Sequence, residues 1–181
     1  MTADGAGREP FERTLGSFGE RRTTMTQVDL RVDPATSQLR SRRLPFELPL
    51  ESNTWKSSSG VQTLWLGPDE WLLVTHSGAG RAATLIGEIG AALGSAHHSA
   101  VDVSAARTVF ELWGAERYDV LAAGCGLDLH ERSWRPGTCA QTLLARVPML
   151  LQEHDGMTRL FVRSSLERYL VTWLERSRPA T

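Results

Sequence analysis

The glycine-rich stretch Gly78-Ala-Gly-Arg-Ala-Ala83 is the part of this sequence that comes nearest to a cofactor motif. It matches G-x-G-x-x-A between an expected strand and an expected helix. In a dinucleotide fold, such glycines let the pyrophosphate reach the helix N-terminus, and an acid such as Asp102 holds a ribose. However, Thr75-His-Ser77 separates the strand from the first glycine, and that strand is expected to pair with its predecessor in a hairpin. We therefore interpret the stretch as a loop that leads into a helix.

Cysteine and histidine could bind a metal or support nucleophilic catalysis, and the candidates are Cys125, His130 and Cys139, with His97 and His98 elsewhere. The sequence contains no C-x-x-C and no H-x-x-x-H pair, so the spacing is not that of a zinc site. Buried free thiols are the better interpretation. No nucleophile elbow surrounds a serine or a cysteine either. The residues therefore assign no catalytic, cofactor-binding or metal-binding site.

Length and composition limit the class of protein to which this chain can belong. The chain has 181 residues and a mass of 20.0 kDa, which suits one globular domain. Its 20 basic and 21 acidic residues give a formal net charge of -1, so no overall field attracts nucleic acid or an anionic membrane. The longest apolar runs are a fraction of the roughly 20 residues that a membrane span requires. The N-terminal residues contain no apolar signal region, and we expect a cytoplasmic protein.

Patterns in the first half predict strands and one helix. Apolar residues alternate over Val28–Val32, as a strand requires. Two β-rich runs, Val61–Leu66 and Trp71–Thr75, flank a Gly-Pro-Asp turn and predict a hairpin. Leucine and isoleucine at helical spacing predict a helix over 80–93, with Gly94 as its C-terminal stop. The remaining expectations are an extended segment at 44–50, a loop at 57–60, and strands at 100–104 and 108–113.

The second half adds two helices and more strands. Residues 115–123 are expected to form a short helix with Tyr118, Leu121 and Ala122 facing inward. Residues 139–152 are strand-rich, and the turn at 154–156 leads into a strand at 159–162. We expect Glu153 and Asp155 in an exposed turn. Ser164 and Glu167 fit an S-x-x-E capping box at the start of the last helix.

The order of elements predicts an α+β fold with a mostly antiparallel sheet and about three helices, because several links between strands are too short for parallel crossovers. Residues 1–24 hold few bulky apolar groups, and we expect them to form a flexible N-terminal tail. The Arg40-Ser-Arg-Arg43 cluster is expected in a solvated loop. The folded domain is expected over 25–176, followed by a C-terminal tail at 177–181.

Several sequence blocks, in the same order, resemble the gamma subunit of heterotetrameric sarcosine oxidase. The resemblance covers about Met25 to Leu174 and leaves the N-terminal tail unmatched. The blocks are Leu30-Arg-Val-Asp33, Leu66-Gly-Pro-Asp-Glu-Trp-Leu-Leu73, Val101-Asp-Val-Ser104 with Arg107, Gly124-Cys-Gly-Leu-Asp-Leu129, Pro136-Gly-Thr-Cys-Ala-Gln-Thr142, and Val162-Arg-Ser-Ser165 followed by Tyr169 and Trp173-Leu174.

This resemblance implies a fold similar to the folate-binding domain of the glycine-cleavage T-protein. It also implies alpha, beta and delta subunits as partners, with FAD, FMN, NAD, tetrahydrofolate and zinc held in those subunits and no cofactor in this chain. The complex of this family oxidises the N-methyl group of sarcosine and releases glycine. The T-protein has an acidic residue at the pterin, and the sequence pattern assigns that role to neither Glu153 nor Asp155.

Three functions follow as hypotheses. The first is a non-catalytic structural subunit that supports the flavin-bearing subunits of a sarcosine oxidase. The second is a stand-alone folate-binding or folate-dependent one-carbon protein, and the third is a dinucleotide enzyme built on Gly78 and Gly80. Arginine and large aromatic residues are typical anchors of buried interfaces. The chain has nineteen arginines, one lysine and six tryptophans, of which Trp55, Trp65 and Trp134 are candidates to face a partner.

Overall fold

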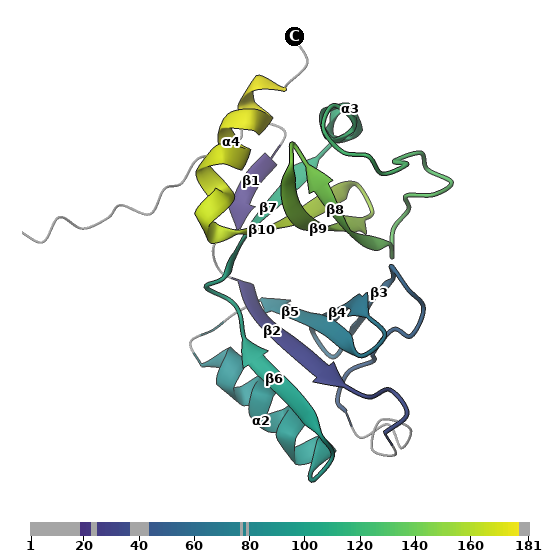
Figure 1. Cartoon of the computed structure of the whole chain (residues 1–181), viewed down its shortest axis with the longest axis vertical. Coiled ribbons are helices and arrows are strands. Elements are labelled where there is room, and N and C mark those ends of the chain that lie inside the picture. The colour runs from purple at the N-terminus through teal and green to yellow at the C-terminus, as the bar shows by residue number, and fades with distance from the viewer. Residues whose placement is uncertain (1–18, 23–24, 37–43, 77, 79, 178–181) are drawn as a thin grey trace, which may run out of the picture.

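The structure is a computed structural model that describes residues 19–22, 25–36, 44–76, 78 and 80–177. In these residues, ten strands form two antiparallel sheets of five strands each (Figure 1). The first sheet has the order β3-β4-β5-β2-β6 and the second the order β1-β7-β10-β9-β8. The first sheet consists of β2 (Met25–Val32), β3 (Trp55–Ser58), β4 (Val61–Gly67), β5 (Glu70–His76) and β6 (His98–Asp102). The second consists of β1 (Gly19–Arg22), β7 (Arg107–Trp113), β8 (Cys139–Leu144), β9 (Val147–His154) and β10 (Met157–Arg163).

The two sheets repeat one arrangement of strands. In the first sheet β3, β4 and β5 form a meander and β2 pairs with β5; in the second, β8, β9 and β10 form a meander and β7 pairs with β10. The fifth strand differs in origin, because β6 follows the first meander whereas β1 comes from the N-terminal side of the chain. All these pairs are antiparallel, which confirms the predicted fold class.

The helices cover the outer faces of the sheets, as Figure 1 shows for α2 (Arg81–Leu93) below the first sheet and α4 (Glu167–Arg176) on the second. A third helix, α3 (Glu116–Ala122), follows β7, and the short 3-10 turn η2 (Ser164–Leu166) precedes α4. The predicted three helices are therefore present. None of the helices in the described part of the chain has the length and apolar character needed to cross a membrane.

Alternation along the strands divides the apolar core into three clusters. Leu85, Ile89 and Leu93 of α2 pack on the outer face of the first sheet. Each such side chain stabilises the fold by roughly 1.5–3 kcal/mol relative to exposure. A second cluster lies between the sheets, where Leu72 and Phe161 belong to the same group of buried residues. The third lies between the second sheet and the helices α3 and α4.

The predicted hairpin and the helix at 80–93 are confirmed. The strands β4 and β5 pair antiparallel with a register shift between Trp65 and Gly67. The helix α2 ends at Leu93 and is capped by Gly94, whose φ of 58° is positive and whose N–H donates to the Gly90 carbonyl. A glycine suits this position because it carries no Cβ.

Two boundary expectations need correction. Residues 19–22, assigned to the N-terminal tail, form β1, because the edge of β7 offers backbone partners that no local pattern reveals. Residues 55–58 form β3, so the loop expected at 57–60 is only the turn that follows. Residues 1–18, the Arg40–Arg43 cluster and residues 178–181 of the predicted C-terminal tail lie outside the described residues.

The predicted capping box at the last helix is wrong. The Ser164 hydroxyl donates to the Ala105 carbonyl at 2.9 Å, and the Glu167 carboxylate accepts from the Thr108 hydroxyl at 2.8 Å. Both side chains therefore bind groups near β7, and the chain enters α4 through η2 with no side-chain cap. In α3, Leu121 is buried and Tyr118 half-buried, but Ala122 is exposed, contrary to expectation.

Candidate functional site

Glu153, near the end of β9, is fully buried, and both of its carboxylate oxygens are occupied by donors from the chain itself. One oxygen, Oε1, accepts from the Arg117 guanidinium at 2.8 Å and from the Tyr118 hydroxyl at 2.7 Å. The other, Oε2, accepts from the Trp134 indole N–H at 2.6 Å and from the Thr158 hydroxyl. The prediction that Glu153 lies in an exposed turn is therefore wrong, because β9 continues to His154.

Elements far apart in the sequence bring these donors together. Thr158 lies directly opposite Glu153 in the pairing of β9 and β10, while Arg117 and Tyr118 come from α3. Trp134 comes from the connection between α3 and β8 and is only 3% exposed. Of the signals in the sequence, only alternation could have indicated this burial: Glu153 lies two residues beyond buried Leu151 on the same face of β9.

The backbone of Glu153 joins the same network. Its carbonyl accepts from the Trp55 indole N–H at 2.9 Å and from the Gly137 N–H at 3.2 Å, and its N–H donates to the Thr138 carbonyl. The strand β3 of the first sheet is thereby tied to the second sheet. Glu153 thus connects α3, the 134–138 segment, β10 and β3.

The arrangement determines what Glu153 can do chemically. A carboxylate has about four lone-pair positions, and four protein donors already occupy them. Arg117 is equally enclosed, because it also donates to the Thr158 hydroxyl and to the Gly114 carbonyl. Burial, together with the hydrogen bond to Glu153, raises the pKa of Tyr118 to about 12. A buried charge closed on all sides is a structural group, and it leaves no free acceptor for a ligand.

A second buried ion pair lies on the opposite face of the same sheet, between the sheets. Arg159 binds one oxygen of Glu111 through Nη2 at 2.6 Å and through Nε at 3.0 Å. Its Nη1 reaches Gln62 of the first sheet at 2.7 Å and Gln152 at 3.1 Å. This group joins the two sheets by polar contacts.

His154 lies next to both networks. Its ring centroid is 4.4 Å from that of Trp55, and its Nε2 is buried without a hydrogen-bond partner among the described residues. Burial, followed by the positive charge of Arg159, lowers the pKa of His154 to about 4. The imidazole is therefore neutral at physiological pH and packs as an aromatic group.

The glycine stretch does not form a dinucleotide site. The strand before it, β5, pairs antiparallel with both β2 and β4, whereas the fingerprint belongs to a parallel βαβ unit. Gly80, with φ of 80°, precedes the first residue of α2, so it serves the turn into the helix. Asp102 accepts from the Ser104 hydroxyl and N–H, and these bonds lower the pKa of Asp102.

The two cysteines and the candidate histidines are placed apart by the fold. Cys139 lies between the sheets, where burial raises the pKa of its thiol to about 12, and its Sγ contacts the Thr54 carbonyl. Cys125 is partly buried against the cluster between the second sheet and the helices α3 and α4. His97 and His98 line a cleft of about 980 Å³ at the end of β2. The described residues contain no group of three or more ligands that could hold a metal ion.

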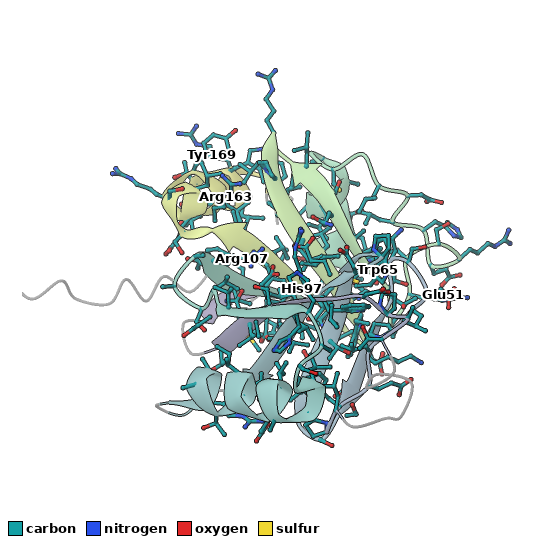
Figure 2. All side chains as sticks on the ribbon, turned by 60° about the horizontal axis from the view of Figure 1, so that its bottom comes forward. Glu51, Trp65, His97, Arg107, Arg163 and Tyr169 are labelled. Atoms are coloured by element: carbon teal, nitrogen blue, oxygen red, sulfur yellow. The ribbon has the colours of Figure 1, made fainter. Side chains whose placement is uncertain are left out.

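The three tryptophans proposed as interface anchors have different positions. Trp134 is a core residue bound to Glu153, which corrects the expectation that it could face a partner. Trp55 and Trp65 are half-buried. Trp55 and the highly exposed Leu50 line a groove of about 470 Å³. Figure 2 shows Trp65 and Glu51 on one side of the molecule and Tyr169 and Arg163 on another.

The two-sheet architecture with its outer helices defines a class of fold. The chain is similar to the glycine-cleavage aminomethyltransferase T of Bartonella henselae, with a TM-score of 0.65, 16% sequence identity, and coverage of 85% of this chain and 44% of that one. This similarity shows the fold alone. The predicted likeness to the T-protein is thereby confirmed.

Within this class the chain belongs to the sarcosine oxidase gamma subunit family, whose model matches residues 29–179. It is 38% identical over 119 residues to a sarcosine oxidase gamma subunit of Corynebacterium sp. (strain P-1), covering 65% of this chain and 57% of that protein. For the gamma subunit of Arthrobacter sp the identity is 41% over 95 residues, covering 52% and 45%. The matches thus span about half the length of these relatives.

A solved structure of the family agrees with the sequence comparison. A chain in the heterotetrameric sarcosine oxidase of Corynebacterium sp. U-96, in complex with pyrrole 2-carboxylate, has a TM-score of 0.79 and 30% identity. The match covers 88% of this chain and 82% of that one. The predicted resemblance is therefore confirmed in both sequence and structure.

Proposed function

We propose that this chain is a non-catalytic structural subunit of a heterotetrameric sarcosine oxidase, which supports flavin-bearing subunits in the oxidative demethylation of sarcosine to glycine. Family membership supports the assignment to the complex. The observation that carries the structural role is the closed network of Glu153, a carboxylate with four donors from its own chain. A group that transfers a proton or binds a substrate needs an accessible atom, and this carboxylate has none.

The other groups with reactive side chains fit the same role. The thiol of Cys139 is buried, with its pKa raised to about 12, so the thiolate nucleophile is scarce at neutral pH. Arg159 and Glu111 are closed on each other and on two glutamines. Among the described residues, the two buried ion pairs, Arg117–Glu153 and Arg159–Glu111, hold sheets and helices together.

The partners in this proposal are the alpha, beta and delta subunits of sarcosine oxidase. FAD, FMN, NAD, tetrahydrofolate and zinc belong to those subunits, and this chain holds no cofactor of its own. The complex works in the cytoplasm. The match to a chain of a heterotetrameric sarcosine oxidase supports this set of partners.

Reconstitution tests the proposal. The alpha, beta and delta subunits are purified with and without this chain, and sarcosine-dependent hydrogen peroxide release is measured for each assembly and for this chain alone. We expect no turnover by the chain alone, and a lower yield or lower thermal stability of the assembly that lacks it. Turnover by the isolated chain, or a three-subunit assembly with unchanged stability, would contradict the proposal.

A second candidate function is folate binding by the isolated chain, which the T-protein-like fold favours. The saturated Glu153 opposes it, because a pterin donor could reach this carboxylate only by displacing one of four protein donors. Titration of the isolated chain with tetrahydrofolate, monitored by isothermal titration calorimetry, decides between the two functions. Saturable micromolar binding would support the second function, and absence of heat would remove it.

A further inference from the structure

The helix α4 and the tip of the β8–β9 hairpin together form a surface that the networks above do not use. We call it the α4–hairpin patch and define it by Arg146, Arg168, Tyr169 and Arg176. Tyr169 is 51% exposed, which makes it one of the four large apolar side chains exposed among the described residues. The Tyr169 hydroxyl donates to the Ala145 carbonyl at 3.0 Å, so the helix and the hairpin tip are in contact.

The patch carries positive charge without partners. Arg146, Arg168 and Arg176 are exposed, and none forms an ion pair with another described residue. The two acidic residues of α4, Glu167 and Glu175, each have interactions of their own. The whole chain has a formal net charge of -1, so this concentration of arginine is local. Tyrosine and arginine are among the residue types that most often anchor protein interfaces.

The hairpin tip is held in a conformation that side chains rarely adopt. Ala145 has φ of 51° and Arg146 φ of 68°, and each costs roughly 1–2 kcal/mol relative to glycine. Two contacts hold the tip: the Ala145 N–H donates to the Gly124 carbonyl at 3.0 Å, and Tyr169 binds the Ala145 carbonyl. Because the tip is fixed before binding, little conformational entropy is lost when it meets a partner.

We propose that the α4–hairpin patch docks onto an acidic, partly apolar surface of another subunit of the sarcosine oxidase, an inference that rests on the proposed function. Charge complementarity selects this occupant, since three arginines without ion-pair partners call for carboxylates. A second copy of the chain that docked through the same patch would bring arginines against arginines. An anionic membrane is the weaker candidate, since lipid-binding clusters carry about four to eight basic residues and the patch has three.

The test uses the chain co-produced with the alpha, beta and delta subunits, with the dissociation constant of the chain measured by biolayer interferometry. The charge-reversed variant combines Arg146→Glu, Arg168→Glu and Arg176→Glu. Leu50→Asp is the matched control, because Leu50 is 72% exposed and lines the separate groove beside Trp55. All these side chains are exposed, and circular dichroism and thermal unfolding of each isolated variant check that the fold is unchanged.

We expect charge reversal to weaken binding at least about tenfold, while Leu50→Asp stays within about twofold of the wild type. Raising NaCl from about 50 to 500 mM should weaken wild-type binding but not further weaken the reversed variant, because salt screens exposed charge pairs. Arg146→Gly, which relieves the positive φ, should weaken binding modestly while the isolated chain becomes more stable.

The outcomes separate this inference from the proposed function. If the wild-type chain does not join the other subunits, the proposed function fails. If it joins and the reversed variant binds equally well, the docking inference alone is overturned. Loss of binding in Leu50→Asp only, self-association of the wild-type chain that charge reversal abolishes, or binding to phosphatidylserine vesicles in place of the subunits would each overturn the inference as well.

Discussion

At the scale of single residues, two neighbouring side chains at the end of β9 show how environment decides the role of an ionisable group. Glu153 is charged and stays buried because donors from α3, β10 and the 134–138 segment surround it. His154, the next residue, points to the other face, where burial and Arg159 lower its pKa to about 4. Adjacent residues of a strand thus serve two different layers of the molecule.

Replacement of Glu153 by glutamine should destabilise the chain strongly. The amide keeps the shape but removes the charge that pairs with buried Arg117, and its NH₂ group meets donors on every side. Breaking a buried pair in this way costs about 3–5 kcal/mol. Urea unfolding measures the loss, with Asp155→Asn as a control two residues away in the exposed turn, for which we expect a change of less than about 0.5 kcal/mol. Equal effects in the two variants would refute the structural role of Glu153.

His154 should make stability depend on pH in a definite direction. Its pKa is about 4 in the folded chain and about 6.5 when unfolded, so between these values the unfolded chain binds more protons. Stability therefore falls as the pH is lowered from 6.5 towards 4. Allowing for partial solvent access, we expect the wild type to lose about 1–2 kcal/mol more than His154→Gln between pH 7 and pH 4.5. Parallel stability curves for the two proteins would contradict this.

At the scale of elements, Gly124, which lies just after α3, lets Trp173 of α4 and the tip of the β8–β9 hairpin come close to the backbone. A Cβ built on Gly124 would lie 2.6 Å from Cζ2 of Trp173 and 3.1 Å from the Ala145 nitrogen. Gly124 also follows α3 closely and its carbonyl accepts the Ala145 N–H. A side chain at this position would push α4 and the hairpin tip apart.

Gly124→Ala should therefore cost about 1–3 kcal/mol, the range for overpacking a filled core. Gly126→Ala is the matched control, since a Cβ there meets nothing within 4 Å, and it should be neutral within about 0.5 kcal/mol. Thermal unfolding compares the two variants. Adding Trp173→Phe to Gly124→Ala should recover part of the loss, because the smaller ring vacates the space; a rescue that fails would point to another cause.

At the scale of the whole molecule, the second sheet takes its fifth strand from the N-terminal side of the chain. Residues 19–22 pair with the stretch of β7 from Val109 to Leu112. This strand protects an edge that would otherwise be open to pairing with another chain. The predicted domain boundary at residue 25 would remove it.

A variant that begins at Met25 tests this contribution. It loses the backbone hydrogen bonds of β1, and we expect the unfolding free energy to fall by about 1–3 kcal/mol. The exposed edge of β7 should also promote concentration-dependent aggregation, which light scattering detects. A variant that begins at Gly19 is the control and should behave like the full chain. Identical stability of the two shortened chains would show that β1 contributes little.

The sequence by itself determined the features that depend on local pattern. Alternation identified the hairpin of β4 and β5, helical spacing identified α2, and short links identified the antiparallel fold class. Ordered sequence blocks identified the family. These signals are readable because they repeat within a few residues and because the hydrophobic period differs between strand and helix.

Only the tertiary structure decided that Glu153 is buried, that Ser164 and Glu167 bind groups near β7 instead of capping α4, and that residues 19–22 form a strand. Each of these depends on partners distant in the sequence: Arg117 precedes Glu153 by 36 residues. A charged residue can be buried only where donors converge on it, and that convergence is a property of the folded chain.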